Sequence, residues 1–181
     1  AEIISRARTE SGDFPILIKM NGTDFIPGGI DIHNFPEIAA EVVKAGVDAI
    51  EVSGGMWDCL VRPKEELGFR PVPSPESHTQ IWKTVQQSYF LPYANELGVD
   101  IPIILVGGNR DVESLEEILK HGKVDFFAMC RPLIREPGLP NRWLAGKENS
   151  LPACVSCNSC LYDMYMHPGR KDPGPVGCIF H

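Results

Sequence analysis

Four short, nearly continuous apolar runs recur along the chain, at 15–20, 49–53, 101–106 and 125–130. They lack the alternation of apolar and polar residues seen in a strand with one solvated face, which is typical of parallel strands covered on both faces. The last three runs follow the similar phrases KAGVD, ELGVD and KHGKVD. Each phrase indicates a helix end capped by glycine, then a turn, then a buried strand.

Amphipathic segments between these runs predict helices. Asn34 is expected to cap a helix over 35–45, with Glu37 as its capping-box partner, and Asp111 is expected to cap a helix over 112–121. A third helix is expected over about 78–97, and a short one near 140–145. The order β-α-β-α-β-α-β predicts repeated right-handed units and hence a parallel sheet. Either a flavodoxin-like open sheet or half of a (β/α)₈ barrel satisfies this order.

Composition narrows the classes of protein. The 181 residues are 43% hydrophobic, and the formal net charge is −7, which indicates one globular domain and argues against a nucleic-acid partner. The longest apolar run, 101–106, is far shorter than the roughly 18 residues of a membrane helix, so we expect no membrane partner. The polar N-terminus has no signal-peptide core, and we expect a cytoplasmic protein whose six cysteines are reduced thiols or metal ligands.

Candidate chemistry lies where the predicted strands end, because parallel α/β sheets bind ligands at that edge. Lys19 places a cation at the first strand end, and Arg131 places another at the last. Glycine pairs at 54–55 and 107–108 would let a ligand approach the backbone closely. The third strand also leads into a helix whose N-terminus would favour an anion. Together these residues predict a phosphate-bearing ligand over the last two strands.

Four phrases carry a family resemblance: FPILIKMNGTDFIPGG, AGVDAIEVSGG, ILVGGNRD and MCRPLIREPGLPNRW. They resemble, in order and over about residues 5–160, the C-terminal half of the old yellow enzyme family of NADH:flavin oxidoreductases. The most similar branch is that of 2,4-dienoyl-CoA reductase. The resemblance implies an α/β fold that is the C-terminal half of a (β/α)₈ TIM barrel, with FMN at its C-terminal mouth. NAD(P)H would be the reductant, and a small molecule would be the acceptor.

The resemblance also implies roles for particular residues. Lys19 would face the N1/O2 edge of the flavin, and the backbone amides of Gly107 and Gly108 would hold the phosphate. Cys130 and Arg131 stand where the family has Gly-Arg, and the cysteine side chain would narrow the approach to the phosphate. The family's first four strands, with the tyrosine proton donor, have no counterpart here, so no catalytic residue is assigned.

The expected organisation is a half TIM barrel of the FMN-binding type over 1–150 and a cysteine-rich tail over 151–181. Such a fragment would be incomplete and inactive alone, and would pair with the missing barrel half or with a second copy. In the long loop 56–77, Trp57, Arg62 and Arg70 either border a substrate pocket or belong to a solvated insertion.

The tail carries Cys154, Cys157 and Cys160, followed at a distance by Cys178. A C-x₂-C-x₂-C run is a known iron–sulfur spacing, and four thiolates also suit zinc. The 2,4-dienoyl-CoA reductase branch carries the ligands of a 4Fe-4S cluster at this place, while free thiols are the third possibility. Two other functions therefore stay open beside the flavin enzyme: a non-catalytic half barrel that binds a phosphorylated ligand, and a metal-binding structural domain.

Overall fold

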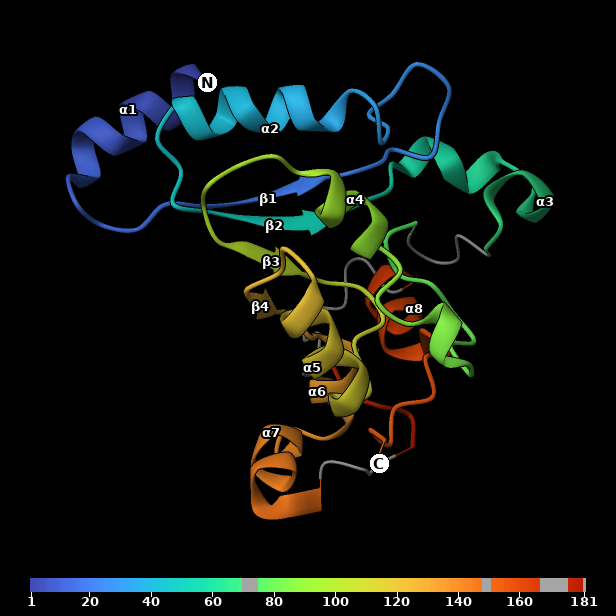
Figure 1. Ribbon diagram of the computed structural model, residues 1–181. Helices are drawn as coiled ribbons and strands as arrows, with labels where there is room; N and C mark the ends of the chain where they lie inside the picture. The colour runs from blue at the N-terminus through green and yellow to red at the C-terminus, as the bar shows by residue number, and fades with distance from the viewer. Residues whose placement is uncertain (70–74, 148–150, 167–175, 181) are drawn as a thin grey trace, which may run out of the picture.

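The computed structural model describes residues 1–69, 75–147, 151–166 and 176–180. Figure 1 shows four strands in chain order: β1 (Leu17–Asn21), β2 (Ala49–Ser53), β3 (Ile103–Leu105) and β4 (Phe126–Phe127). The helices before β3 are α1 (Glu2–Ser11), α2 (Phe35–Lys44), α3 (Lys64–Leu67) and α4 (Leu91–Glu96). Those after it are α5 (Val112–His121), α6 (Arg131–Arg135), α7 (Leu139–Arg142) and α8 (Ser159–Met166). Short 3₁₀ turns cover Trp57–Val61 and Thr84–Gln86, and a wider π-helical turn covers Trp143–Lys147.

The four strands form one parallel sheet in the order β1-β2-β3-β4. This confirms the predicted α/β fold with four parallel strands. In a flavodoxin-like sheet the first two strands exchange places, whereas here each strand pairs with its neighbour in sequence. Consequently all four strand ends, where the candidate residues lie, come to one edge of the sheet.

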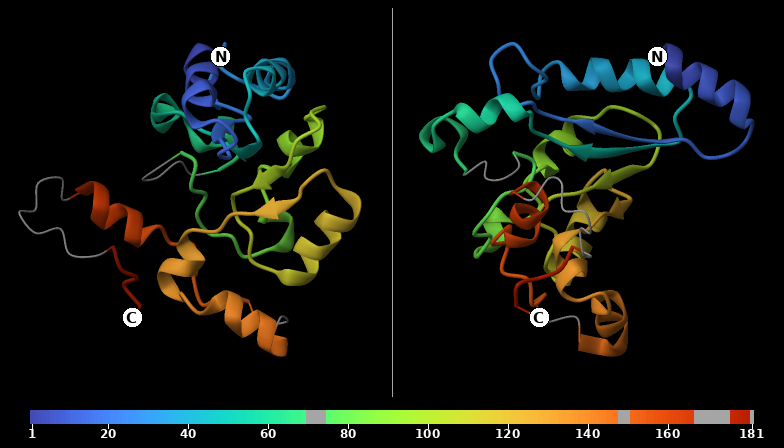
Figure 2. Two further views of the ribbon diagram at one scale, coloured as in Figure 1. Left: turned by 90° about the vertical axis from the view of Figure 1, so that its left-hand side faces the viewer. Right: turned by 180° about the vertical axis from the view of Figure 1, so that it is seen from behind.

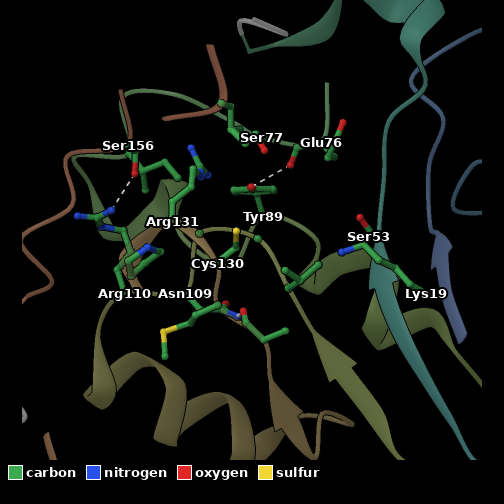
Figure 3. A pocket seen from close by; sticks show the side chains of 18 residues that line it. Lys19, Ser53, Glu76, Ser77, Tyr89, Asn109, Arg110, Cys130, Arg131 and Ser156 are labelled. Atoms are coloured by element: carbon green, nitrogen blue, oxygen red, sulfur yellow. Dashed lines mark hydrogen bonds between the residues drawn. The ribbon is translucent and has the colours of Figure 1, made fainter. Parts of the chain in front are cut away.

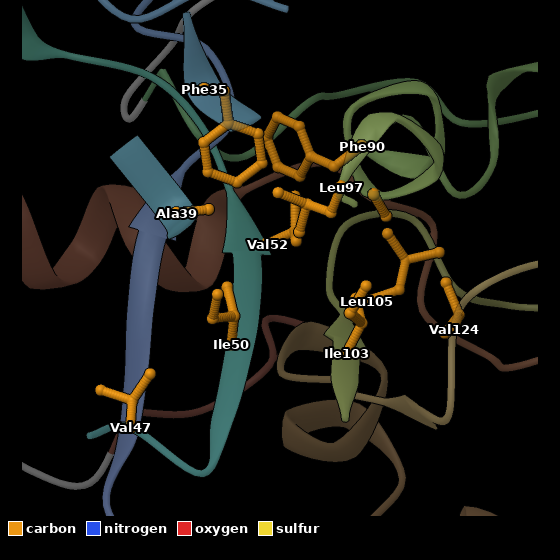
Figure 4. Close-up of a cluster of buried hydrophobic side chains, with 11 residues drawn as sticks. Phe35, Ala39, Val47, Ile50, Val52, Phe90, Leu97, Ile103, Leu105 and Val124 are labelled. Atoms are coloured by element: carbon orange, nitrogen blue, oxygen red, sulfur yellow. The ribbon is translucent and has the colours of Figure 1, made fainter. Parts of the chain in front are cut away.

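A single hydrophobic core covers one face of this sheet (Figure 4). Ile50 and Val52 of β2 are completely buried there, together with Phe35 of α2. The opposite face is more open, since Leu17 is 59% exposed and Phe126 is 58% exposed. The two further views in Figure 2 show α1 and α2 together beside the N-terminal strands, while α7 and α8 lie toward the other end of the molecule.

The aspartate that closes two of the repeated phrases has a structural role that the sequence did not reveal. Asp48 donates its N–H to Ile16 O (2.8 Å), and its carboxylate accepts the Ile16 N–H (2.6 Å). Asp125 does the same with Ile103, at 2.9 and 2.8 Å. Each aspartate thus satisfies both backbone groups at the start of the neighbouring strand. The predicted glycine cap is correct for Gly46, which follows α2 with φ +105°.

The helix boundaries over 35–45 and 112–121 are confirmed, but only one of the two predicted caps is. Asp111 accepts the Ser114 N–H at 3.1 Å, as expected of an N-cap. Asn34 makes no cap bond. Its Oδ1 accepts the Asp31 N–H (2.9 Å) and its Nδ2 donates to Gly29 O (3.1 Å), so the preceding turn uses the side chain. The capping box with Glu37 is therefore wrong.

The helix predicted over 78–97 is also wrong, because only Thr84–Gln86 and α4 are helical within it. Contacts distant in sequence override the local preference. Tyr89 donates its N–H to Gly107 O (3.2 Å), and Ser88 Oγ donates to Asn109 Oδ1 (3.1 Å), which ties the segment to the end of β3. Ser88 and Gln80 also adopt positive φ, at 46° and 56°, which interrupts a helix. The short helix expected near 140–145 is present as α7 and the turn that follows it.

Within the described ranges, no helix combines the length and the apolar character needed to cross a membrane.

Candidate functional site

The five residues that the sequence predicts for flavin binding all line one cavity of about 310 Å³ (Figure 3). They are Lys19, Gly107, Gly108, Cys130 and Arg131. The cavity lies at the carboxyl ends of β3 and β4, where ligands bind in parallel α/β sheets. The chain therefore brings together at one edge residues that are up to 112 positions apart, from Lys19 to Arg131.

Two arginines supply the positive charge of the cavity. Arg131 donates from Nη1 to His78 O (2.7 Å) and to Asn158 Oδ1. Arg110, only 7% exposed, donates from Nη1 to Ser156 Oγ (2.7 Å) and from Nη2 to Cys154 O. Among the residues that the structure describes, neither guanidinium has a carboxylate within ion-pair distance. Because a buried charge without a counter-charge is unfavourable, this wall of the cavity favours an anion.

The backbone adds further donors at the end of β3. Gly107 and Gly108 have φ of +102° and +77°, and in the described part of the chain neither amide has a hydrogen-bond acceptor. Two amides and two guanidinium groups form a set of donors only, which suits phosphate oxygens. The N-terminus of α5, which the sequence suggested as a further anion site, is closed by the carboxylate of Asp111.

The glycines also accommodate an aromatic ring. A Cβ on Gly107 would lie 2.6 Å from Tyr89 Cε2, and one on Gly108 would lie 2.9 Å from Tyr89 Cδ1. The Tyr89 hydroxyl donates to Glu76 O at 3.1 Å, and burial raises the pKa of Tyr89, so the phenol is neutral at neutral pH. The close approach that the sequence attributes to a ligand is thus made on one side by Tyr89.

Asn109 joins the ends of β3 and β4 beneath the cavity. Its side chain is 2% exposed, and Nδ2 donates to Leu105 O (2.7 Å) and to Ala128 O (3.0 Å). It fixes the two strand ends relative to each other, so that the glycine amides and Arg131 face the same cavity.

Lys19 lies at the other end of the cavity, on β1 (Figure 3). Its ammonium is 2.7 Å from Glu51 Oε1, and its side chain is 53% exposed. Lys19 and Glu51 are register partners on neighbouring strands, so their side chains share one face of the sheet. The sequence had not indicated this carboxylate partner, which offsets part of the lysine charge.

The segment 154–160 is a built wall of the cavity rather than a loose tail. Ser156 and Asn158 are each 2% exposed and have φ of +53° and +62°. Asn158 Nδ2 donates to Ser77 O (2.6 Å), and Ser156 O accepts the Gln80 N–H (3.1 Å). With the bonds from Arg110 and Arg131, these contacts hold the segment on both sides.

The cysteines of this region are not arranged as a metal centre. Cys130 is exposed and lines the cavity, while Cys154, Cys157, Cys160 and Cys178 are free thiols. Over 1–69, 75–147, 151–166 and 176–180, no group of three or more His, Cys, Asp or Glu side chains could hold a metal ion. Burial alone would raise the pKa of the Cys157 thiol, but its hydrogen bonds with Ser159 leave that pKa below its ordinary value.

Several site residues escaped the sequence reading because their partners lie far along the chain. Arg110 stands at the end of the phrase GGNR, and its place beside a strand end was the available signal. Asn109, Ser156 and Asn158 carried no such signal. Of the loop residues, Arg62 pairs with Glu66 at 2.6 Å and lines a separate cavity, Trp57 is 57% exposed, and Arg70 lies outside the described residues.

Proteins of known function show what the chain is similar to. It is 31% identical over 158 residues to an NADH oxidase from Thermoanaerobacter brockii, with 87% of this chain and 22% of that protein covered. It is 30% identical over 150 residues to an NADH-dependent flavin oxidoreductase from Hypocrea jecorina, with 77% and 33% covered. The chain thus spans a third or less of the length of these relatives. No protein-family model matches the sequence.

A solved structure has a similar fold. The 6-hydroxypseudooxynicotine amine oxidase of Pseudomonas geniculata superimposes with a TM-score of 0.65 at 20% identity, over 91% of this chain and 23% of that one. The chain is thus similar in fold to part of this amine oxidase, and similar in sequence to parts of NADH-dependent oxidoreductases.

Proposed function

We propose that the protein is part of an FMN-dependent NAD(P)H oxidoreductase of the old yellow enzyme family. The observation that carries this proposal is the cavity in which all five sequence-predicted residues meet, where two arginines and the backbone amides of Gly107 and Gly108 supply hydrogen-bond donors. The similarity to an NADH oxidase and to an NADH-dependent flavin oxidoreductase supports it independently.

The residues present fit the phosphate end of FMN. The amides of Gly107 and Gly108 and the guanidinium of Arg131 would hold it, with Arg110 adding positive charge from the buried side. Lys19, at the opposite end of the cavity, would place a positive charge beside the flavin ring, and Glu51 would offset part of this charge. Bound FMN would supply hydride transfer from NAD(P)H to a small-molecule acceptor.

The strand order supports a half barrel. Four consecutive strands pair in sequence order, and the sheet face that carries Leu17 and Phe126 is open. Four strands cannot close a barrel, since closure fixes strand number, tilt and stagger together. We propose that the rest of a longer protein, or a second copy, covers this face in the working enzyme.

Flavin binding tests the proposal directly. Quenching of FMN fluorescence on titration with the protein gives an affinity, and Arg131→Ala should weaken it by about 1.5–3 kcal/mol, the range of a charged hydrogen bond. This corresponds to roughly a ten- to 150-fold higher Kd. Arg135→Ala is the matched control, because Arg135 also lies in α6 but donates to Phe180 O. Equal FMN affinity of the Arg131→Ala variant and the wild type would overturn the phosphate assignment.

The rival function is a non-catalytic module that binds any phosphorylated ligand, and the Lys19–Glu51 pair favours it because Glu51 reduces the charge available to a flavin ring. Competition separates the two. A phosphate module releases FMN when inorganic phosphate is added at concentrations near the Kd of FMN, whereas a flavin site retains it. Oxidation of NADH by the longer protein that contains this chain, supplied with FMN, then tests the reaction.

A further inference from the structure

A second cavity, of about 770 Å³, adjoins the 310 Å³ cavity described above, which we call the anion cavity. The two share Ile81 and Tyr89 as lining residues, so these side chains form the partition between them. The second cavity is bounded by Phe25, which follows β1, and by Tyr93 of α4. Its volume is in the range of cavities that bind small molecules.

Five of the thirteen described lining residues carry rings: Phe25, Phe69, His78, Tyr89 and Tyr93. His78 is stacked between Phe69 and Tyr89, with ring centroids 3.8 Å away on both sides and interplanar angles of 17° and 10°. Phe25 meets Phe69 edge to face at 4.8 Å. The stack covers both faces of His78, so the cavity offers mainly ring edges, which can meet the face of a planar aromatic ligand in an edge-to-face arrangement.

Among the described residues that line this cavity, the charge is positive. Burial lowers the pKa of His78 to about 3, with Arg131 contributing, so the imidazole is neutral near pH 7. Lys64 of α3 is the one charged side chain among the described lining residues. No described carboxylate lies within ion-pair distance of Lys64. Glu66, on the same helix, pairs with Arg62 instead.

We propose that this aromatic cavity binds an aryl carboxylate, with its ring against the Phe25–Phe69 side and its carboxylate toward Lys64. The rings supply a site for an aromatic group, and the Lys64 ammonium selects a negative charge over a neutral polar group. Tyr89 packs against Gly107 and Gly108, so this ligand would lie behind Tyr89 at the phosphate end of the first cavity, as a second ligand and not as the hydride acceptor. The proposal therefore does not rest on the proposed function.

The probe for this site is 3-phenylpropionate, titrated by calorimetry into the protein without FMN or pyridine nucleotide. Two analogues separate the contributions: 3-cyclohexylpropionate lacks the aromatic ring, and 3-phenyl-1-propanol lacks the charge. We expect 3-phenylpropionate to bind most tightly, by roughly two- to tenfold over either analogue, because ring contacts and one exposed ion pair are each modest.

Variants then assign the residues. Lys64→Gln should raise the Kd of 3-phenylpropionate roughly two- to fivefold and leave that of 3-phenyl-1-propanol unchanged. Lys44→Gln is the matched control, an exposed helix lysine whose partner is Glu41. Phe69→Leu should weaken both aromatic probes. If that variant does not fold, the Lys64→Gln result and the comparison of the three ligands on the wild type still decide.

Each outcome separates this proposal from the proposed function. Absence of 3-phenylpropionate binding, or equal affinity for all three ligands, overturns the proposal, as does an unchanged Kd in Lys64→Gln. Binding of 3-phenylpropionate by a protein that fails to bind FMN supports the aromatic site and contradicts the flavin function. Unchanged binding in Arg131→Ala, which alters the neighbouring cavity, further supports two separate sites.

Discussion

At the residue scale, the backbone of Gly107 is constrained in two ways that a single comparison can separate. Its φ is +102°, and a Cβ there would lie 2.6 Å from Tyr89 and 2.7 Å from Phe90. Gly28 has a similar φ of +77°, but nothing lies within 4 Å of its missing Cβ. Gly28→Ala therefore reports backbone strain alone, and Gly107→Ala reports strain together with overpacking.

We expect Gly28→Ala to lower the free energy of unfolding by about 1–2 kcal/mol. Gly107→Ala should lower it by about 1–3 kcal/mol more, because Tyr89 and Phe90 must shift. Urea denaturation of the two variants measures the difference. A Gly107→Ala variant as stable as Gly28→Ala would show that the ring of Tyr89 does not pack where the structure places it.

The depressed pKa of His78 predicts a pH dependence of stability. The unfolded chain binds a proton at His78 below about pH 6.5, whereas the folded protein does so only near pH 3. Stability is therefore complete above pH 6.5 and falls as the pH drops toward 3, by about 1.4 kcal/mol per pH unit at this site.

His78→Phe keeps an aromatic ring between Phe69 and Tyr89 but removes the titrating group. We expect the free energy of unfolding of this variant to fall less steeply between pH 6.5 and 4.5 than that of the wild type. His33→Ala, at an exposed histidine, should leave the wild-type slope unchanged. Identical slopes for the wild type and His78→Phe would mean that His78 is charged in the folded protein.

At this scale, the sequence predicts contacts between residues close in the chain and misses contacts between distant ones. Asp111 caps α5 because its acceptor lies three residues away, within reach of a local pattern. Asn34 looked equivalent, but its amide bonds to the backbone of the turn before it. Lys19 and Arg131 were found from their places at strand ends, whereas Arg110 was not singled out because its partners, Cys154 and Ser156, follow more than forty residues later.

At the element scale, hydrogen bonds connect the segment 154–160 to residues of the anion cavity. Asn158 bonds to Ser77 O and to the Arg131 guanidinium, although it is not among the residues that line the cavity. We expect Asn158→Ala to release one side of Arg131 and weaken FMN binding several-fold, since a hydrogen bond to a charged group contributes about 1.5–3 kcal/mol when fully retained.

The same variant should make the thiols of Cys157 and Cys160 react faster with a disulfide reagent, because the segment between them loses a buried anchor. Val155→Ala is a control in the same segment that leaves the Arg131 bond and the Cys157–Ser159 hydrogen bond in place. Unchanged FMN affinity together with faster thiol reaction would show that the segment is anchored by Asn158 but that Arg131 is not positioned by it.

Strands were easier to predict than the helix between them. The runs at 15–20, 49–53 and 101–106 are mostly apolar and short, which favours strands, and β1, β2 and β3 lie within one residue of these bounds. The expectation that both faces are covered is not met, since Leu17 of β1 is 59% exposed. The segment 78–97 has helical spacing of apolar residues. Its Tyr89 and His78 are instead fixed by the end of β3 and by ring stacking, and such distant partners cannot be read from a local pattern.

At the scale of the whole molecule, the open face of the sheet predicts association. Leu17 and Phe126 are more than half exposed on it, at opposite edges of the four-stranded sheet. If two copies cover these faces mutually, light scattering will show a mass that rises with concentration above the 20.0 kDa of one chain. The double variant Leu17→Lys, Phe126→Lys should then remain monomeric, because charge on the covered face opposes burial.

Leu144→Lys, at a leucine that is 87% exposed elsewhere, is the control for added charge. The same concentration dependence in the double variant and the wild type would exclude this face as the interface between copies. The four-stranded parallel α/β sheet could be predicted from the sequence, whereas the course of the chain between the strands could not.

The sheet narrows from β1 to β4. Five register pairs join β1 to β2, three join β2 to β3, and two join β3 to β4. Amide hydrogen exchange should therefore be slowest in β2 and fastest in β4, since local opening requires fewer bonds to break there. A dianion bound by both the end of β3 and Arg131 would add a connection between β3 and β4, the pair of strands with the fewest register pairs. Its clearest signature would be a slower exchange of the Phe127 and Ala128 amides, which lie 19 to 21 residues along the chain from Gly107 and Gly108.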